Sequence, residues 1–186
     1  MMKVLFIHGL ASSGAYKTAS TLRTLLRPCE ILAPDVPIEP EAALALLQGL
    51  CETERPDLIV GLSLGGFWAL QLRGWHKILI NPDRHPSHLL RTKIGEMKYL
   101  SPRRDGALSF FITPEICEGY EALEAKEFDG LDAAEVVLTD GLFATDDELI
   151  HCGPEFERHY PDRAHAYPGT HLPTFPEIKR YLLPLV

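Results

Sequence analysis

The sequence has only four cysteines, and no two of them lie close together. They form no Cys-x-x-Cys pair, so the chain lacks the pattern of a disulfide framework and the ligand spacing of a structural zinc site. Long apolar runs are missing too: the run at residues 4–7 is stopped by His8 and Gly9 and is too short for a signal sequence or a membrane span. We therefore expect a reducing, cytoplasmic setting and no membrane association. The cysteines are Cys29, Cys51, Cys117 and Cys152.

Positive charge is also in short supply. The 186 residues carry 18 Lys and Arg against 26 Asp and Glu, a formal net charge of −8. This balance argues against a nucleic-acid or acidic-lipid surface. The chain contains no Gly-rich phosphate loop and no dinucleotide fingerprint. The pairs His85-x-x-His88 and His151-Cys152 have no third ligand near them in sequence, so we expect neither a cofactor nor a metal.

What the sequence does have is an ordinary globular composition, 46% hydrophobic and 24% charged, and a length that fits one domain over residues 1–186. Short apolar runs alternate with segments of helical spacing in its first half. The alternation predicts a mostly parallel sheet covered by helices on both faces, which is the α/β class. The expected strands are residues 3–7, 30–33, 58–61 and 77–80, and the expected helices are residues 15–27, 41–53 and 64–73.

The regular alternation breaks down after Asp83. Residues 92–132 read as an irregular insertion after the fourth strand, either a lid or cap over a site or an ordinary packed excursion. Helices are expected at residues 85–91 and 114–128. The β-rich segments 136–138 and 142–144 predict one strand that leads into Asp146 and Asp147. A helix over 153–159, a strand over 164–167 and a closing helix over 173–185 complete the prediction.

The motif with most chemical content is Gly-x-Ser-x-Gly at residues 61–65. An apolar strand precedes it and a helix follows it, which is the context of a nucleophile elbow that exposes one serine hydroxyl. A serine hydroxyl needs a neighbouring base, and that base needs a third group to orient it. Ser63 is thus the candidate nucleophile. The alternative is a Gly-rich strand–helix turn with a structural serine.

The base and the acid follow from position along the chain. In this arrangement the order is serine, acid, histidine, all after the carboxyl ends of strands. His171 comes directly after the last expected strand, in a Gly-x-His turn, and is the candidate base. Asp147 follows the strand before it and is the candidate acid. Asp83, after the fourth strand, and the neighbours Asp146 and Glu148 remain alternatives for the acid.

An oxyanion needs preorganised N–H donors. One is expected to be the backbone amide of Leu64, at the start of the elbow helix, and the other that of Leu10, in the loop after the first strand. His8 is at the same edge of the predicted sheet, where we expect it to brace this loop rather than take part in the chemistry.

Five short segments, spread over nearly the whole chain, resemble the α/β-hydrolase superfamily and, more narrowly, the small bacterial YqiA-type esterases of the UPF0227 group. The resemblance implies Ser63 as nucleophile, Asp147 as acid and His171 as base, with no cofactor, in the hydrolysis of short-chain acyl esters. The segments are His8-Gly9-Leu10, Gly61 to Gly66, Asn81-Pro82, Asp147-Glu148 and Gly169-Thr170-His171.

The chain departs from the family pattern at Asp146, where a glycine often precedes the acid. Residues 92–132 match poorly, so the resemblance does not extend to substrate specificity, and nothing in the sequence indicates the oligomeric state. A small-molecule ester or thioester is the expected partner. A fold that lost turnover and only binds, or the same three residues used for acyl transfer or carbon–carbon bond hydrolysis, are the alternatives.

Overall fold

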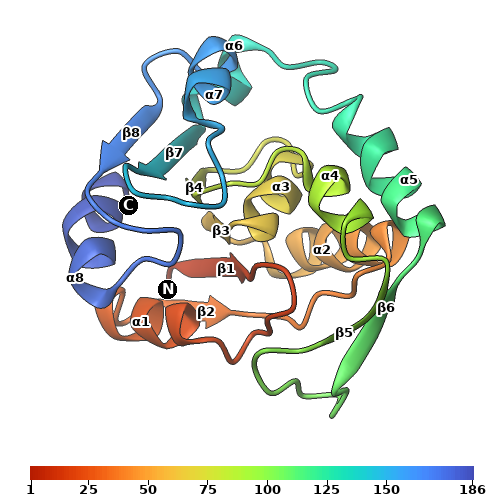
Figure 1. The fold of residues 1–186 in the computed structure, drawn as a ribbon. Helices are drawn as coiled ribbons and strands as arrows, with labels where there is room; N and C mark the ends of the chain where they lie inside the picture. The colour runs from red at the N-terminus through yellow and green to blue at the C-terminus, as the bar shows by residue number, and fades with distance from the viewer.

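The structure is a computed structural model that describes all residues 1–186. The strands of its central sheet are β1 (Lys3–Ile7), β2 (Glu30–Leu32), β3 (Leu58–Leu62), β4 (Lys77–Ile80), β7 (Thr139–Ala144) and β8 (Ala164–Tyr167). Their order is β2-β1-β3-β4-β7-β8, and every neighbouring pair is parallel (Figure 1). All carboxyl ends therefore meet at one edge, which is where ligands bind in open α/β sheets.

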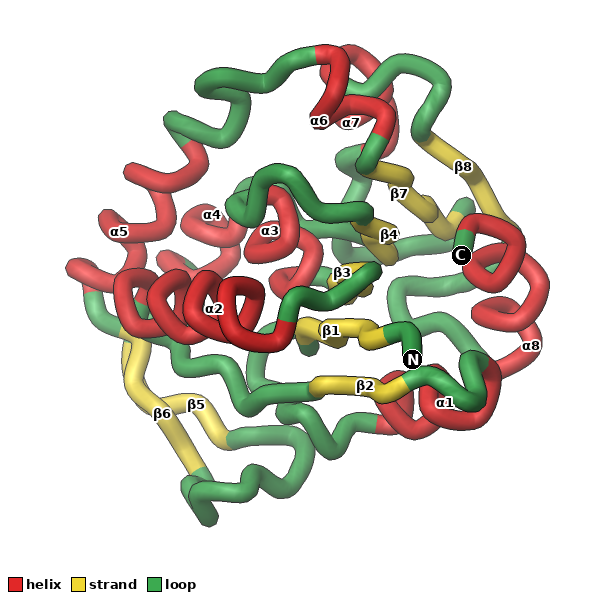
Figure 2. The backbone as a smooth tube through the Cα atoms, turned by 180° about the vertical axis from the view of Figure 1, so that it is seen from behind, coloured by secondary structure: helices red, strands yellow, loops and turns green.

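Helices cover both faces of this sheet, as the alternation predicts. Figure 2 shows α1 and the C-terminal helices on one side of the strands and α2, α3 and α5 on the other. No helix is both long and apolar enough to cross a bilayer. The helices are α1 (Lys17–Leu25), α2 (Pro40–Glu54), α3 (Leu64–Leu70), α4 (Pro86–Arg91), α5 (Pro114–Glu124), α6 (Ala133–Val137), α7 (Gly153–His159), α8 (Phe175–Glu177), η1 (Ile178–Leu182) and η2 (Leu183–Leu185).

Successive side chains of β1 point to opposite faces of the sheet, so the strand contributes to a separate part of the core on each face. Leu5 and Ile7 pack with α2 and α3, whereas Val4 and Phe6 pack with α1 and η1. Because both faces are buried, the strands read in the sequence as unbroken apolar runs.

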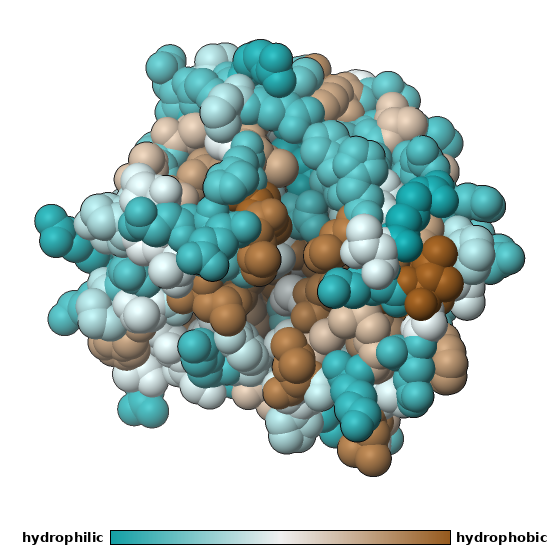
Figure 3. All heavy atoms as spheres, viewed as in Figure 1, coloured by the Kyte–Doolittle hydropathy of each residue, from teal (hydrophilic) through white to brown (hydrophobic).

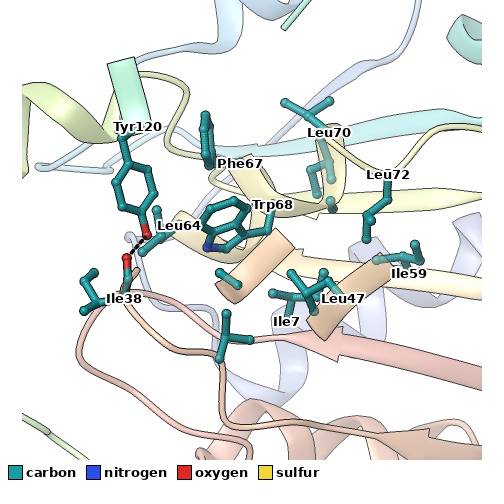
Figure 4. Packing of buried hydrophobic residues seen from close by; sticks show 14 of the residues in the cluster. Ile7, Ile38, Leu47, Ile59, Leu64, Phe67, Trp68, Leu70, Leu72 and Tyr120 are labelled. Carbon is teal, nitrogen blue, oxygen red and sulfur yellow. Dashed lines mark hydrogen bonds between the residues drawn. The ribbon is translucent and has the colours of Figure 1, made fainter. Parts of the chain in front are cut away.

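Aromatic packing joins α3 to α5 on the first of these faces. The rings of Phe67 and Trp68 lie against Tyr120, and the Tyr120 hydroxyl donates to the Ile38 carbonyl oxygen at 3.2 Å (Figure 4). All of α3 is buried, which fixes the helix that begins directly after Ser63.

The insertion after β4 contains a hairpin that the sequence analysis did not predict. β5 (Gly95–Lys98) and β6 (Ser109–Ile112) pair antiparallel and form a separate sheet. The stretch between these strands binds the loop after β1, because Leu100 N donates to Ala11 O at 2.7 Å and Ser13 Oγ donates to Pro102 O at 2.7 Å. The insertion therefore contacts the same loop that carries Leu10.

Two further expectations need correction. Val136 and Val137 belong to α6 and not to a strand, because Asp132 caps this helix by accepting from Glu135 N at 2.9 Å; β7 begins only at Thr139. The closing helix expected over residues 173–185 is three short pieces, α8, η1 and η2, with a wide π turn in the middle. The expected bounds of β1, β4, α7 and β8 agree with the structure.

Candidate active site

Ser63 lies at a strained turn between β3 and α3. Its φ of 56° and ψ of −120° are unusual for a residue with a side chain, and such strain gathers at functional sites. Gly65 makes the turn possible, because a Cβ there would lie 2.0 Å from the Ile7 carbonyl oxygen. A Cβ on Gly61 would lie 2.4 Å from the Gly65 carbonyl oxygen. The two glycines of the motif thus let the turn press against β1 and project the serine.

Three side chains that are distant in sequence meet at this turn. His171 Nε2 lies 3.0 Å from Ser63 Oγ, and His171 Nδ1 lies 2.8 Å from Asp147 Oδ2. An ionised carboxylate only accepts hydrogen bonds, so Nδ1 carries the proton toward Asp147 and Nε2 is left to accept from the serine hydroxyl. This tautomer is the one that a general base needs. The structure brings together the three residues that the sequence analysis proposed.

The Asp147 side chain is held on both oxygens. Oδ1 accepts from the backbone N–H groups of Leu149 at 2.8 Å and Ile150 at 3.0 Å, and Oδ2 faces His171. The residue is 3% exposed. Its neighbours Asp146 and Glu148 are exposed and make no hydrogen bond to the imidazole, so the turn presents one carboxylate to His171.

Two backbone amides are available beside the serine. Neither Leu10 N nor Leu64 N donates a hydrogen bond within the protein. His8 braces the first of these positions: Nδ1 donates to the Gly9 carbonyl oxygen at 2.8 Å, and Nε2 accepts from Val36 N at 3.0 Å. Burial lowers the pKa of His8, which favours the neutral ring that these two contacts require. His8 therefore belongs to the scaffold of the Leu10 loop, as expected.

Asn81 is a site residue that the sequence analysis missed. It directly follows β4 and has a positive φ of 44°, and its buried amide Nδ2 donates to the His171 carbonyl oxygen at 2.8 Å. Its Oδ1 accepts from Ala144 N at 2.8 Å. The side chain thereby ties the end of β7 to the loop that carries the base. The sequence analysis singled out Asn81-Pro82 only as part of the family resemblance, and no pattern in the sequence indicates the contact with His171.

A cavity of about 320 Å³ opens beside Ser63 and His171. Polar side chains in its wall include Asp83, His85, His88 and His151, and apolar ones include Leu89 and Leu149. Asp83, the alternative acid, therefore faces the cavity, but it makes no hydrogen bond to His171. In the view of Figure 1, apolar side chains gather around a hollow near the middle of the face (Figure 3).

A second, much smaller slot of about 20 Å³ lies on the other side of Leu10, with Leu64, Trp68 and Phe110 in its wall.

Two histidines of the cavity wall, His85 and His88, also contact other side chains of the protein. His85 Nε2 lies 2.9 Å from Glu155 Oε2, and the His85 and His88 rings stack at 5.7 Å between centroids. No group of three or more His, Cys, Asp or Glu side chains is arranged to hold a metal ion.

The model of the uncharacterised protein family UPF0227 matches residues 3–112. No curated protein sequence matches the chain. Among solved structures, it is similar to a methylesterase from Arabidopsis, with a TM-score of 0.64 and 12% identity over 99% of this chain and 98% of that one. Est1E from Butyrivibrio proteoclasticus, solved with ferulic acid bound, gives a TM-score of 0.65 and 15% identity over 100% and 89% of the chains.

A pyrethroid hydrolase from Sphingobium faniae gives a TM-score of 0.59 and 13% identity over 97% and 94% of the two chains. At such low identities, the likeness concerns the fold and not the substrate.

Proposed function

Since the chain belongs to the uncharacterised protein family UPF0227 and has the α/β-hydrolase fold, we propose that it is a serine hydrolase that cleaves a small ester or thioester. The observation that carries this proposal is the hydrogen-bonded chain from Ser63 Oγ through His171 to Asp147, with steps of 3.0 Å and 2.8 Å. Ester hydrolysis by neighbours of the same fold, among them a methylesterase, is consistent with it.

The proposed reaction proceeds through an acyl-enzyme. Ser63 Oγ attacks the acyl carbon while His171 Nε2 takes its proton, and the resulting oxyanion accepts hydrogen bonds from the amides of Leu10 and Leu64. Collapse breaks the bond to the leaving alcohol or thiol, which receives the proton from His171. Water then attacks the acyl carbon with His171 again as base, and the acid and free serine are regenerated.

Asp147 neither gains nor loses a proton in this scheme. It holds the Nδ1–H tautomer of His171 and stabilises the imidazolium that forms in each half-reaction. The hydrogen bonds from Leu149 and Ile150 hold the carboxylate in place, so that the imidazole is orientated before substrate arrives.

The test is turnover of p-nitrophenyl acetate and a graded series of longer esters and thioesters by the wild type and by Ser63→Ala. We expect activity in the wild type and only buffer background in the variant. Undiminished turnover in a folded Ser63→Ala protein contradicts the assignment. Product analysis with alcohol and thiol acceptors distinguishes hydrolysis from acyl transfer, because an acyltransferase passes the acyl group to the acceptor in preference to water.

A further inference from the structure

The cavity beside Ser63 is unusual in its charges. Its wall contains one carboxylate, that of Asp83, and no lysine or arginine. The next residue, Arg84, does not supply a cation to it. The Arg84 side chain is fully buried, with Nε at 3.0 Å from Glu127 Oε1 and Nη1 at 3.4 Å from Glu155 Oε2. An anionic substrate would therefore meet a carboxylate with no ammonium or guanidinium group to offset it.

Asp83 is fixed close to the nucleophile through its backbone. Its N–H donates to the Ser63 carbonyl oxygen at 3.1 Å. One carboxylate oxygen, Oδ1, accepts from His85 N at 3.1 Å, and Oδ2 accepts from no group of the protein. Burial raises the pKa of Asp83; the His85 N–H and the nearby His85 and His171 side chains favour the ionised carboxylate only in part, so a cation in the cavity would stabilise it further.

The turn alone does not require this charge. An asparagine side chain accepts a hydrogen bond from a following N–H as well as aspartate does, and both favour such turns. A negative charge beside a reaction that develops an oxyanion disfavours that reaction, unless a bound cation offsets the charge.

The position of His171 indicates which part of the substrate meets Asp83. The leaving group has to lie within reach of the imidazole that protonates it. The cavity that contains Asp83 is also lined by Ser63, His171 and Leu10, whereas the apolar slot is lined by Leu10 and Leu64 but by neither Ser63 nor His171. The leaving alcohol is therefore expected in the cavity, within reach of both His171 and Asp83.

We propose that Asp83 is a specificity-determining residue that binds an ammonium or amine group on the alcohol part of the substrate, so that the enzyme prefers esters of amino alcohols. This inference rests on the proposed hydrolase function and adds a substrate class to it. The reaction is ordinary hydrolysis: the ester and water give the acid and the cationic alcohol, with Ser63 and His171 restored.

The test compares two esters of nearly the same shape, acetylcholine, which carries a positive charge, and 3,3-dimethylbutyl acetate, which is neutral. At pH 8 and low salt we expect wild-type kcat/KM to favour the charged ester by about tenfold or more, the size of effect expected for one partly screened charge pair. Asp83→Asn keeps the acceptor for His85 N, and in this variant the ratio of kcat/KM for the charged ester to that for the neutral ester should fall to about one.

Glu148→Gln is the matched control, because it removes an exposed carboxylate outside the cavity wall and should keep the preference. A wild type that turns over the neutral ester as fast as the charged one overturns the Asp83 inference and leaves the hydrolase proposal intact. A preference that persists in Asp83→Asn overturns it too. If Ser63→Ala turns over both esters as fast as the wild type, the hydrolase proposal itself is contradicted.

A second measurement does not depend on ester turnover. Choline, but not 3,3-dimethylbutanol, should protect wild-type Ser63 from a neutral fluorophosphonate, and Asp83→Asn should abolish this protection. Equal protection by both alcohols contradicts the inference.

Discussion

Asn81 Nδ2 donates a hydrogen bond of 2.8 Å to the carbonyl oxygen of His171, so the end of β4 holds the loop that carries the proposed base. We expect Asn81→Ala to lower kcat by about 10–100-fold with little change in KM, because a small displacement of a catalytic group is costly in rate. Steady-state kinetics on a panel ester measure this. Tyr167→Phe, which removes a neighbouring hydroxyl 3.0 Å from the same amide, is the control and should lower kcat less than threefold.

Equal losses in the two variants, or full kcat in a folded Asn81→Ala protein, would show that the amide does not position His171.

Asp147 and Asp146 are adjacent, yet only the first is hydrogen-bonded to His171. We expect Asp147→Asn to lower kcat by about 10³–10⁴-fold, because the amide favours the wrong imidazole tautomer. Asp146→Asn should leave kcat within about twofold, since surface substitutions away from such contacts change little. Reversed effects would assign the acid to Asp146.

The pair Arg84 and Glu127 is buried, and the Arg84 guanidinium also lies 4.5 Å over the Phe128 ring. Glu127→Ala leaves this charge without its main partner, so we expect the free energy of unfolding to fall by about 3–5 kcal/mol in urea titrations. Glu121→Ala breaks an exposed pair with Arg91 and should cost less than about 1 kcal/mol. Similar costs for the two would mean that the buried pair is solvated in solution.

His8 should make stability depend on pH. Its folded pKa lies below the usual 6.5 because the ring is buried, so the unfolded chain binds a proton first. The free energy of unfolding should therefore fall as the pH drops below about 6.5, by at most about 1.4 kcal/mol per pH unit for this one proton. In His8→Gln this part of the slope between pH 7.5 and 5 should vanish. Parallel curves for wild type and variant would contradict the assignment of the slope to His8.

The parts of the fold that the sequence predicts are those set by local pattern. The apolar run Lys77–Ile80 and the Gly-x-Ser-x-Gly turn around Ser63 both hold in the structure. The β5–β6 hairpin was missed because ten residues separate two short strands, and one of them, Gly95–Lys98, has Met97 as its single apolar side chain. Val136 was predicted to lie in a strand because it is β-branched. In the structure it lies in α6, which begins after the N-cap residue Asp132.

The site shows the same division. Ser63, Asp147 and His171 are identifiable because each follows a strand whose carboxyl end reaches one edge. Asn81 reaches His171 across 90 residues of sequence, and no local pattern reports such a contact. The unpartnered oxygen of Asp83 likewise becomes apparent only once the cavity and the buried Arg84 are placed.

The most direct measurement of the central claim is where a fluorophosphonate probe attaches. Intact-mass and peptide mass spectrometry of the wild type should show one adduct, on Ser63, formed much faster than in His171→Ala, because the imidazole 3.0 Å away activates the hydroxyl. Ser63→Ala should form none. A folded wild-type protein that stays unlabelled, or carries the probe on another residue while Ser63 is free, would contradict the claim.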